Sequence, residues 1–364
     1  MTRVLFLTRY PIEGASSRYR VFQYLPHLEA LGVEADVQSF MDTPMYELSL
    51  SSGKTMSKIW ATLCATTRRL WALRNWKSYD VIYLQRELLP FGGPVIERWL
   101  KRRGAVLFFD YDDALFIKKA SRYNKIATLL RSGDKALQLF RVANCVVAGN
   151  NWLRDAAISA GANQAVTLEV AEDTARIAMH APHTNDAPVT IGWLGSPSTV
   201  KYLRVIESML QEIAQTYPNV QWEIMGGNDF AMEGVDWKLC DWSLDEELKA
   251  LARFDIGLMP LPLEDWAKGK SGGKARTYMA AGIVPVVTAI GYNLELVRNG
   301  ETGYLCSSLD DWHAALTQLI EDANLRQTLA TAARAEIETR FDPATIAASM
   351  AQLFTEAVDD TKAN

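Results

Sequence analysis

The sequence predicts an α/β protein of two domains, each built on a parallel β-sheet. Short apolar runs typical of buried parallel strands alternate with stretches of helical periodicity, in the order found in βαβ units. This alternation fades over residues 171–188, which are polar and contain two prolines, and then starts again. The length of 364 residues is also about right for two domains rather than one.

The first series of elements precedes this polar stretch. Apolar or alternating runs predict strands at residues 3–8, 33–40, 79–85, 105–111 and 144–150. Helical spacing of apolar residues predicts helices at residues 19–31, 91–103 and 126–141.

The second series follows it. Apolar runs predict strands at residues 189–195, 221–226, 254–260 and 283–289. Helices are predicted at residues 200–216, at 274–281 and from 310 to the end, with a break at 341–343. We therefore predict an N-terminal domain over 1–182, a C-terminal domain over 183–340 and a last helix over 341–364 that packs back on the N-terminal domain. Both domains are Rossmann-like by this pattern, and ligands bind at the carboxyl ends of the strands in such sheets.

The composition excludes several other classes of protein. With 49% hydrophobic and 22% charged residues and a mean hydropathy of −0.06, the chain is neither a disordered polymer nor a fibrous rod. Its four cysteines stand far apart without a Cys-x-x-Cys pair, so we expect reduced, mostly buried thiols. The apolar run at the N-terminus is too short for a signal peptide and no run is long enough to span a membrane, so we expect a cytoplasmic protein.

Charge is distributed unevenly along the chain. Residues 1–182 hold 24 lysines and arginines against 17 aspartates and glutamates, whereas residues 183–364 hold 14 against 26. The basic excess is greatest over 49–78, where no acidic residue occurs and cations are interspersed with tryptophan and leucine. Such a basic amphipathic helix is a candidate for binding an anionic membrane surface, at the inner face of the cell membrane. The alternative is a helix packed on its own domain with a solvated basic face. No nucleic-acid partner is expected.

Two loops of the C-terminal domain have the composition of a phosphate site. The first follows the strand at 189–195, and its small and hydroxyl residues allow an anion to approach a helix N-terminus. Its candidates are Gly195, Ser196, Ser198, Thr199 and Lys201. The second follows the strand at 254–260, and its glycines and lysines predict a basic cradle of backbone N–H groups. Its candidates are Lys270, Gly272, Gly273 and Lys274. Neither loop has P-loop or dinucleotide spacing, so an ordinary capped turn and a flexible basic loop are the alternatives.

Acidic residues of the N-terminal domain follow the strand at 105–111. Asp110, Asp112 and Asp113 are candidates for a base or an electrostatic stabiliser, and a Mg²⁺ site is the weaker reading. A solvated loop that caps the next helix is the alternative. The four histidines, which include His180 and His183 in the polar stretch, have neither metal-ligand nor triad spacing, so we predict no metal site.

Basic residues follow two other predicted strands of this domain. Arg9, Gly14 and Arg18 lie in or near the loop after the strand at 3–8, where glycine and serines would let a ligand approach. Arg86 directly follows the strand at 79–85. Guanidinium groups bind phosphates and carboxylates, so the three arginines are candidates for ligand binding. The alternative is a surface turn with an exposed basic helix start.

The second half of the chain resembles a known family. A strand ending at Pro260 is followed by the Gly-Lys-x-Gly-x-Lys loop of residues 269–274 and by a helix ending in Tyr-Met-Ala-Ala-Gly at 278–282. A Pro-Val-Val strand and a tail with Glu295, Gly300 and Gly303 come next. This order is similar to the donor-binding half of GT-B glycosyltransferases of the family 4 kind. Because residues 144–162 resemble the end of the first domain of that fold, the resemblance covers nearly the whole chain, most closely residues 189–305.

The resemblance implies a GT-B fold, with two Rossmann-like domains facing each other across a cleft. It implies retaining transfer of a sugar, without a bound metal or a permanently bound cofactor, in cell-surface polysaccharide synthesis. The donor would be a nucleotide-diphosphate sugar, such as a UDP- or GDP-sugar, held by the C-terminal domain through the two loops, Thr277 and Glu295, with Gly14 also near it. The acceptor, a saccharide or a lipid-linked saccharide, would be held by the N-terminal domain, with Arg9, Arg18 and Arg86 as the candidate acceptor-binding residues.

The chain departs from the family at one feature. The family's two glutamates, eight positions apart, would fall at Gly269 and Thr277, neither of which is acidic. Glu264 or Asp265 are considered as substitutes, and the aspartates at 110–113 as replacements for a family histidine. Three alternative functions stay open: a non-catalytic nucleotide-sugar sensor or assembly subunit, a peripheral membrane scaffold, and a GT-B nucleotide-sugar 2-epimerase. An epimerase would need acidic residues and histidines close together in the cleft, and the positions of the four histidines argue against it.

Overall fold

The structure is a computed structural model that describes residues 1–51, 53–117, 134–179, 187–227 and 229–363. The chain forms two compact units: unit 1 comprises Met1–Ala171 with Pro343–Asn364, and unit 2 comprises Glu172–Asp342. The division lies ahead of the boundary predicted at 182, and the C-terminal segment belongs to unit 1. The predicted helix at 126–141 and the polar stretch with His180 and His183 lie partly outside the described residues.

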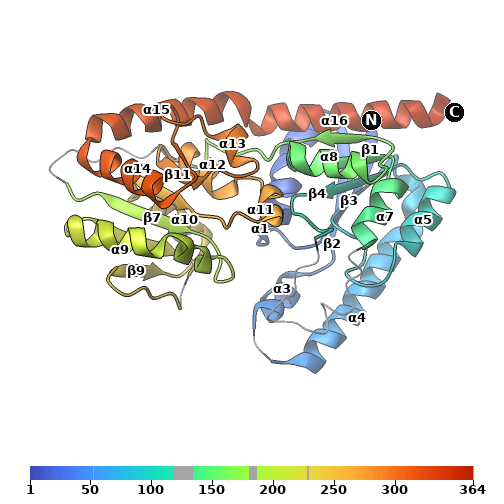
Figure 1. Cartoon of the computed structure of the whole chain (residues 1–364). Helices are drawn as coiled ribbons and strands as arrows, with labels where there is room; N and C mark the ends of the chain where they lie inside the picture. The colour runs from blue at the N-terminus through green and yellow to red at the C-terminus, as the bar shows by residue number, and fades with distance from the viewer. Residues whose placement is uncertain (52, 118–133, 180–186, 228, 364) are drawn as a thin grey trace. The chain divides into compact units, whose positions relative to one another are not determined.

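A six-stranded parallel sheet forms the centre of unit 1 (Figure 1). Its strands in spatial order are β2 (Val33–Ser39), β1 (Thr2–Thr8), β3 (Val81–Gln85), β4 (Leu107–Tyr111), β5 (Cys145–Ala148) and β6 (Ala165–Thr167). The chain passes from β1 to β2 on one side and then returns to β3 on the other. The topological switch point, where ligands bind in such sheets, therefore lies between β1 and β3.

Helices pack on both faces of this sheet. The ring of Phe354, in the C-terminal helix α16, packs edge-on against Tyr83 and Phe108 on one face. On the other face, Phe140 of α7 packs against Phe109. The helical segments of unit 1 are α1 (Ala15–Arg20), η1 (Phe22–Tyr24), α2 (Leu25–Ala30), α3 (Thr43–Leu50), α4 (Thr55–Ala72), η2 (Leu73–Ser78), α5 (Val95–Arg102), α7 (Asp134–Val142), α8 (Asn151–Ser159) and α16 (Pro343–Ala363).

Unit 2 has a second six-stranded parallel sheet. Its spatial order is β12 (Tyr304–Cys306), β11 (Val284–Thr288), β10 (Ile256–Met259), β7 (Thr190–Leu194), β8 (Gln221–Met225) and β9 (Trp237–Cys240). The chain passes outward through β7, β8 and β9 and then crosses back to β10, so the switch point lies between β7 and β10. The helical segments are η3 (Val200–Ile206), α9 (Glu207–Thr216), α10 (Leu244–Leu251), α11 (Asp265–Lys268), α12 (Gly273–Ala280), α13 (Asn293–Leu296), α14 (Leu309–Glu321) and α15 (Ala323–Arg340).

The predicted two-domain α/β fold with parallel sheets is confirmed, and the differences are local. The helix predicted over 19–31 is broken, because Val21 leaves helical geometry at φ −135° and Pro26 lacks the N–H that would continue the helix. The sequence pattern does not reveal β6, β9 and β12, which are edge strands of three or four residues.

Two further expectations concern thiols and membrane spans. All four cysteines are free, but Cys64 is exposed and Cys240 half-buried, so only Cys145 and Cys306 are buried as expected. None of the described helices is both long enough and apolar enough to cross a bilayer.

Candidate functional site

The two phosphate-site loops of unit 2 follow the two strands that flank its switch point. Gly195 comes directly after β7, and the loop from β10 leads to α12. Tyr278 of α12 joins them, since its hydroxyl accepts from the Leu194 N–H at 3.0 Å and donates to the Leu258 carbonyl at 3.2 Å. Its ring lies so close over Gly257 that a Cβ there would come within 2.4 Å of it. The helix is therefore held directly on the sheet, with both loops at the same edge.

The first loop is a tight turn closed by its own hydroxyl groups. The Thr199 Oγ1 donates to the Ser196 carbonyl at 3.0 Å, and the Ser196 and Ser198 hydroxyls lie 2.8 Å apart. Thr199 is the N-cap residue of η3, but no side-chain hydrogen bond caps this helix. Ser196 and Ser198 are exposed, so their hydroxyl groups are open to a ligand.

The second loop depends on Gly272. This residue has a φ of +66°, which favours glycine, and a Cβ would come within 2.7 Å of Leu296. Gly272 is the N-cap of α12, so Gly273 and Lys274 stand in the first turn of this helix. Not every lysine of the loop is available, because Lys268 pairs with Asp265 at 2.8 Å.

Lys274 is the central cation of this site. Its Nζ lies 5.2 Å from the centre of the Trp193 ring, and its Cε would be 2.8 Å from a Cβ on Gly195. No carboxylate among the described residues pairs with it. Burial, together with the neighbouring Lys270, lowers the pKa of Lys274 to about 8. A half-buried cation that faces another cation and a glycine loop is suited to bind an anion.

Two aromatic rings lie between lysines of the two loops. Lys270 Nζ lies 5.3 Å from the Trp266 ring, and the ring of Trp266 lies 5.4 Å from that of Tyr202. Lys201 Nζ lies 5.4 Å from the Tyr202 ring. The structure thus connects Lys201 of the first loop with Lys270 of the second through two packed rings.

Thr277 is buried and hydrogen-bonded to a residue that sequence reasoning missed. Its Oγ1 donates to Glu172 Oε2 at 3.3 Å, and Arg276 Nε lies 3.5 Å from the same oxygen. Burial raises the pKa of Glu172 to about 7, against the opposing effect of Arg276. Glu172 therefore places a carboxylate beside Thr277, and only tertiary contact could reveal this, because more than a hundred positions separate the two residues.

The other donor-side acids lie around the second loop. Glu295 is exposed on α13, and a Cβ on Gly272 would come within 2.7 Å of Leu296 of this helix and 3.1 Å of its N-cap residue Tyr292. Of the two considered substitutes, Asp265 is engaged with Lys268, and Glu264 accepts from the Trp266 indole. Neither acid is free to take over a binding role without breaking these contacts.

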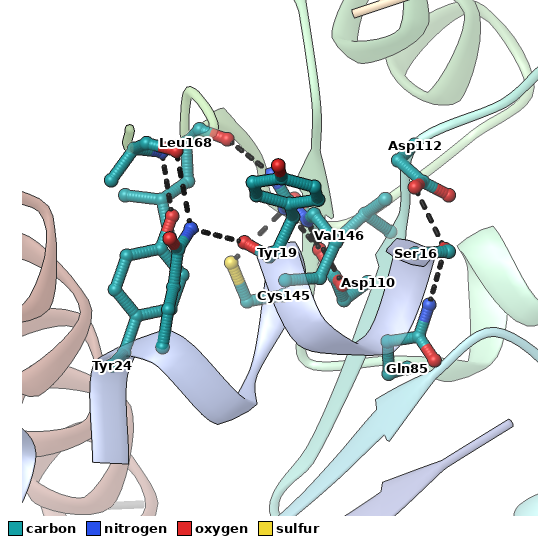
Figure 2. A network of polar contacts seen from close by, with 12 residues as sticks. Ser16, Tyr19, Tyr24, Gln85, Asp110, Asp112, Cys145, Val146 and Leu168 are labelled. Carbon is teal, nitrogen blue, oxygen red and sulfur yellow. Dashed lines mark hydrogen bonds and ion pairs between the residues drawn. The ribbon is translucent and has the colours of Figure 1, made fainter. Parts of the chain in front are cut away.

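The unit 1 candidates gather at the switch point between β1 and β3, around Gln85. Gln85 accepts from the Ser17 hydroxyl at 2.8 Å and donates to the Ser16 hydroxyl at 3.0 Å. Ser16 in turn donates to Asp112 Oδ2 at 2.8 Å, which ties α1 to the segment after β4 (Figure 2). A Cβ on Gly14 would come within 2.3 Å of Tyr10, so Gly14 lets this loop fold back on itself.

The three predicted catalytic aspartates have different environments. Asp110 is fully buried and ion-paired with Arg20, and its catalytic role stays a prediction. Burial alone would lower the pKa of Arg20, but the adjacent carboxylate raises it above its ordinary value. Asp112 and Asp113 are half-buried, and Asp112 is the one that the Ser16 hydroxyl orients.

The three predicted acceptor arginines also differ. Arg18 is buried and donates to the Ile12 and Glu13 carbonyls, so its guanidinium holds the loop, and Arg9 lies 5.5 Å from the Phe40 ring. The backbone of Arg86 is left-handed, with a φ of +67°, which is unusual for a residue other than glycine. Such a conformation costs folding free energy and is found most often at functional sites. Burial would lower its pKa, but Tyr10 and Asp112 raise it.

A metal site was not predicted for this chain. In the part that the structure describes, no three His, Cys, Asp or Glu side chains come together as metal ligands would.

Comparison with known proteins gives a family match over part of the chain. Residues 188–322, within unit 2, match the model of the family described as glycosyl transferases group 1. No curated protein sequence matches the chain.

Solved structures match over almost the whole chain. A structure of HepE from Anabaena, in complex with UDP and glucose, is 17% identical with a TM-score of 0.70, covering 98% of this chain and 100% of that one. Sucrose-phosphate synthase from Thermosynechococcus elongatus is 15% identical with a TM-score of 0.68, covering 98% and 99%. A glycosyltransferase from Rickettsia africae is 14% identical with a TM-score of 0.66, covering 98% of each chain. The whole chain therefore has the GT-B fold, and residues 188–322 match the glycosyl transferases group 1 family.

Proposed function

We propose that the protein is a glycosyltransferase that takes a sugar from a nucleotide-diphosphate sugar held by unit 2. The observation that carries this proposal is Lys274, a half-buried lysine that pairs with no carboxylate of the described residues and lies near Lys270 and the Gly195 loop at a sheet switch point. A diphosphate would neutralise this charge, and the lysines would stabilise the charge that develops on it as the sugar leaves. The match of residues 188–322 to the glycosyl transferases group 1 model supports the same conclusion.

The donor base is proposed from the fold alone. The similar HepE structures contain UDP, UDP with glucose, or UDP-glucose. We propose a UDP-sugar, with a GDP-sugar as the alternative. Ser196, Ser198, Thr199, Gly272 and Gly273 would surround the diphosphate. Glu172, beside Thr277, supplies a carboxylate close to one of the positions where the resemblance would place a glutamate.

The acceptor is proposed to bind to unit 1. Asp112, oriented by Ser16, is the proposed catalytic carboxylate, and Arg86 the proposed contact to an anionic or polar group of the acceptor. We propose a retaining reaction on a saccharide or lipid-linked acceptor of cell-surface polysaccharide synthesis. A lipid-linked acceptor would require the enzyme to work at a membrane surface.

Nucleotide binding is the first test. Thermal unfolding of the full chain is measured with UDP, GDP, ADP, TDP and CMP. A ligand at about 100 times its Kd stabilises by about 2.7 kcal/mol, so one diphosphate is expected to raise the Tm clearly. No shift with any nucleotide contradicts the donor assignment. A shift without transfer of sugar from the matching donor to any saccharide or lipid acceptor favours the non-catalytic subunit instead, and interconversion of donor epimers favours the epimerase.

Binding of the diphosphate is expected to weaken as the pH rises through about 8. The pKa of Lys274 is lowered to about 8, so the ammonium group is present below that pH and lost above it. Above this pKa the affinity should fall about tenfold per pH unit, until the pKa of the complex is reached. Titration calorimetry between pH 7 and pH 9 measures the effect. The Lys274→Gln variant is the control, because it should bind weakly with a flat profile. A flat profile for the unmodified chain would exclude Lys274 from the binding step.

A further inference from the structure

Helix α4 carries an apolar stripe on its outer side. Met56, Trp60 and Trp71 are 78%, 69% and 67% exposed, and Ile59, Leu63 and Leu70 are exposed as well. At 3.6 residues per turn, these six side chains fall within an arc of about 120°. Ala65 and Arg69, the buried residues of α4, lie on the opposite side of the helix. Its exposed face is therefore an unpartnered apolar surface.

The position of α4 makes this stripe available. Figure 1 shows α4 in blue, extending from the sheet of unit 1 with α3 beside its first turns. Leu50 at the end of α3 is also exposed. Exposed apolar residues scattered singly are ordinary, whereas six on one helix face indicate an interaction surface.

The charges around the stripe identify its partner. No acidic residue occurs from 48 to 79, whereas cations stand at both ends of α4. Lys54 precedes the helix, and Arg74 and Lys77 follow it; none of the three is paired with a carboxylate among the described residues. The Arg74 guanidinium lies 4.8 Å from the Trp71 ring, so cation and apolar surface adjoin. A cavity of about 220 Å³ lined by Trp71, Arg74 and Asn75 opens at the same end.

We propose that this face of α4 docks the protein on an anionic lipid surface. Apolar side chains would enter the interfacial layer of the bilayer while Lys54, Arg74 and Lys77 contact lipid phosphates. Tryptophan is suited to this boundary because its ring is apolar and its N–H is polar. A second copy of the chain fits less well, since two such faces would bring like charges together without a carboxylate between them. The inference is independent of the donor site, which lies in unit 2.

Vesicle flotation of the full chain tests the proposal. The protein is expected to float with vesicles of phosphatidylcholine and phosphatidylglycerol and not with phosphatidylcholine alone. Trp60→Gln with Trp71→Gln should weaken partitioning roughly tenfold or more. Lys54→Gln with Arg74→Gln and Lys77→Gln should weaken it roughly a hundredfold at low salt, because each cation contributes roughly fivefold.

A matched control is available on the same unit. Leu31 and Ile158 are also about half exposed but lie outside α4, so Leu31→Gln with Ile158→Gln should leave flotation unchanged. Thermal unfolding with UDP is measured for every variant, because failure of nucleotide binding would concern the proposed donor site and not this surface.

Three results would overturn the proposal. They are absence of flotation with anionic vesicles, equal flotation with neutral ones, and unchanged flotation of the tryptophan variant. A chain that sediments as a dimer, and as a monomer once Trp60 and Trp71 are replaced, would assign the face to subunit contact if vesicle binding is also absent.

Discussion

Replacing Lys274 by methionine is expected to raise the Tm of the ligand-free chain while removing most of its affinity for nucleoside diphosphate. Burial and Lys270 lower the pKa of Lys274 to about 8, below its value in the unfolded chain. The protonated side chain therefore costs folding free energy at every pH below about 8, and this cost fades as the pH rises toward the unfolded pKa. Since Lys274 is partly exposed, we expect methionine to recover about 1–3 kcal/mol at neutral pH.

The loss of binding has a separate cause. A charge-assisted hydrogen bond to phosphate contributes about 1.5–3 kcal/mol, so Lys274→Met should weaken binding about 10- to 100-fold. Thermal unfolding with and without the diphosphate, followed by titration calorimetry, measures both effects on one sample. A lower Tm with unchanged binding would place the phosphate site elsewhere.

Lys268→Met is the matched control. Lys268 belongs to the same loop, but its Nζ is 2.8 Å from Asp265 and the side chain is 43% exposed. An exposed pair of this kind contributes little to stability, so both the Tm and the affinity should stay close to those of the unmodified chain.

Breaking the Arg20–Asp110 pair is expected to destabilise unit 1 by about 3–5 kcal/mol. Both side chains are buried, and Arg20 also donates to the Leu168 carbonyl at 2.6 Å. Arg20→Met would leave the Asp110 carboxylate buried without its counter-ion. Arg20→Met combined with Asp110→Leu should recover part of the loss, because it removes both charges. The denaturant midpoints of the three proteins measure these differences.

The Asp112→Asn variant tests whether the Asp112 carboxylate takes part in sugar transfer or only stabilises the fold. Asp112 is half-buried and bonded to a hydroxyl group, so its replacement should leave stability nearly unchanged and reduce sugar transfer. If Asp110→Asn retains full stability and loses transfer, the prediction that Asp110 is catalytic is supported. The comparison requires nucleotide binding to be intact in each variant.

The sequence alone was sufficient to predict most of the fold. Buried parallel strands are nearly continuous apolar runs, so β1, β3, β4, β7, β10 and β11 could be recognised from local composition. The short edge strands β6, β9 and β12 could not, because three or four residues show no clear period. The helix expected over 19–31 is interrupted because Pro26 overrides the spacing of its apolar residues.

The candidate site, like the fold, could be predicted from the sequence only in part. Sequence by itself determined which loops carry glycines, lysines and aspartates at strand ends, and it identified 49–78 as basic and amphipathic. Only the tertiary structure decided which of those groups are already paired: Asp110 with Arg20, Lys268 with Asp265, and Thr277 with Glu172. Two of these pairs join residues about a hundred positions apart, which no local motif records, and the Lys268–Asp265 pair depends on side-chain conformations that the sequence does not give. The exposure of the α4 stripe is a further example. The sequence shows that α4 has an apolar face, but only the packing of the folded chain shows that this face is exposed.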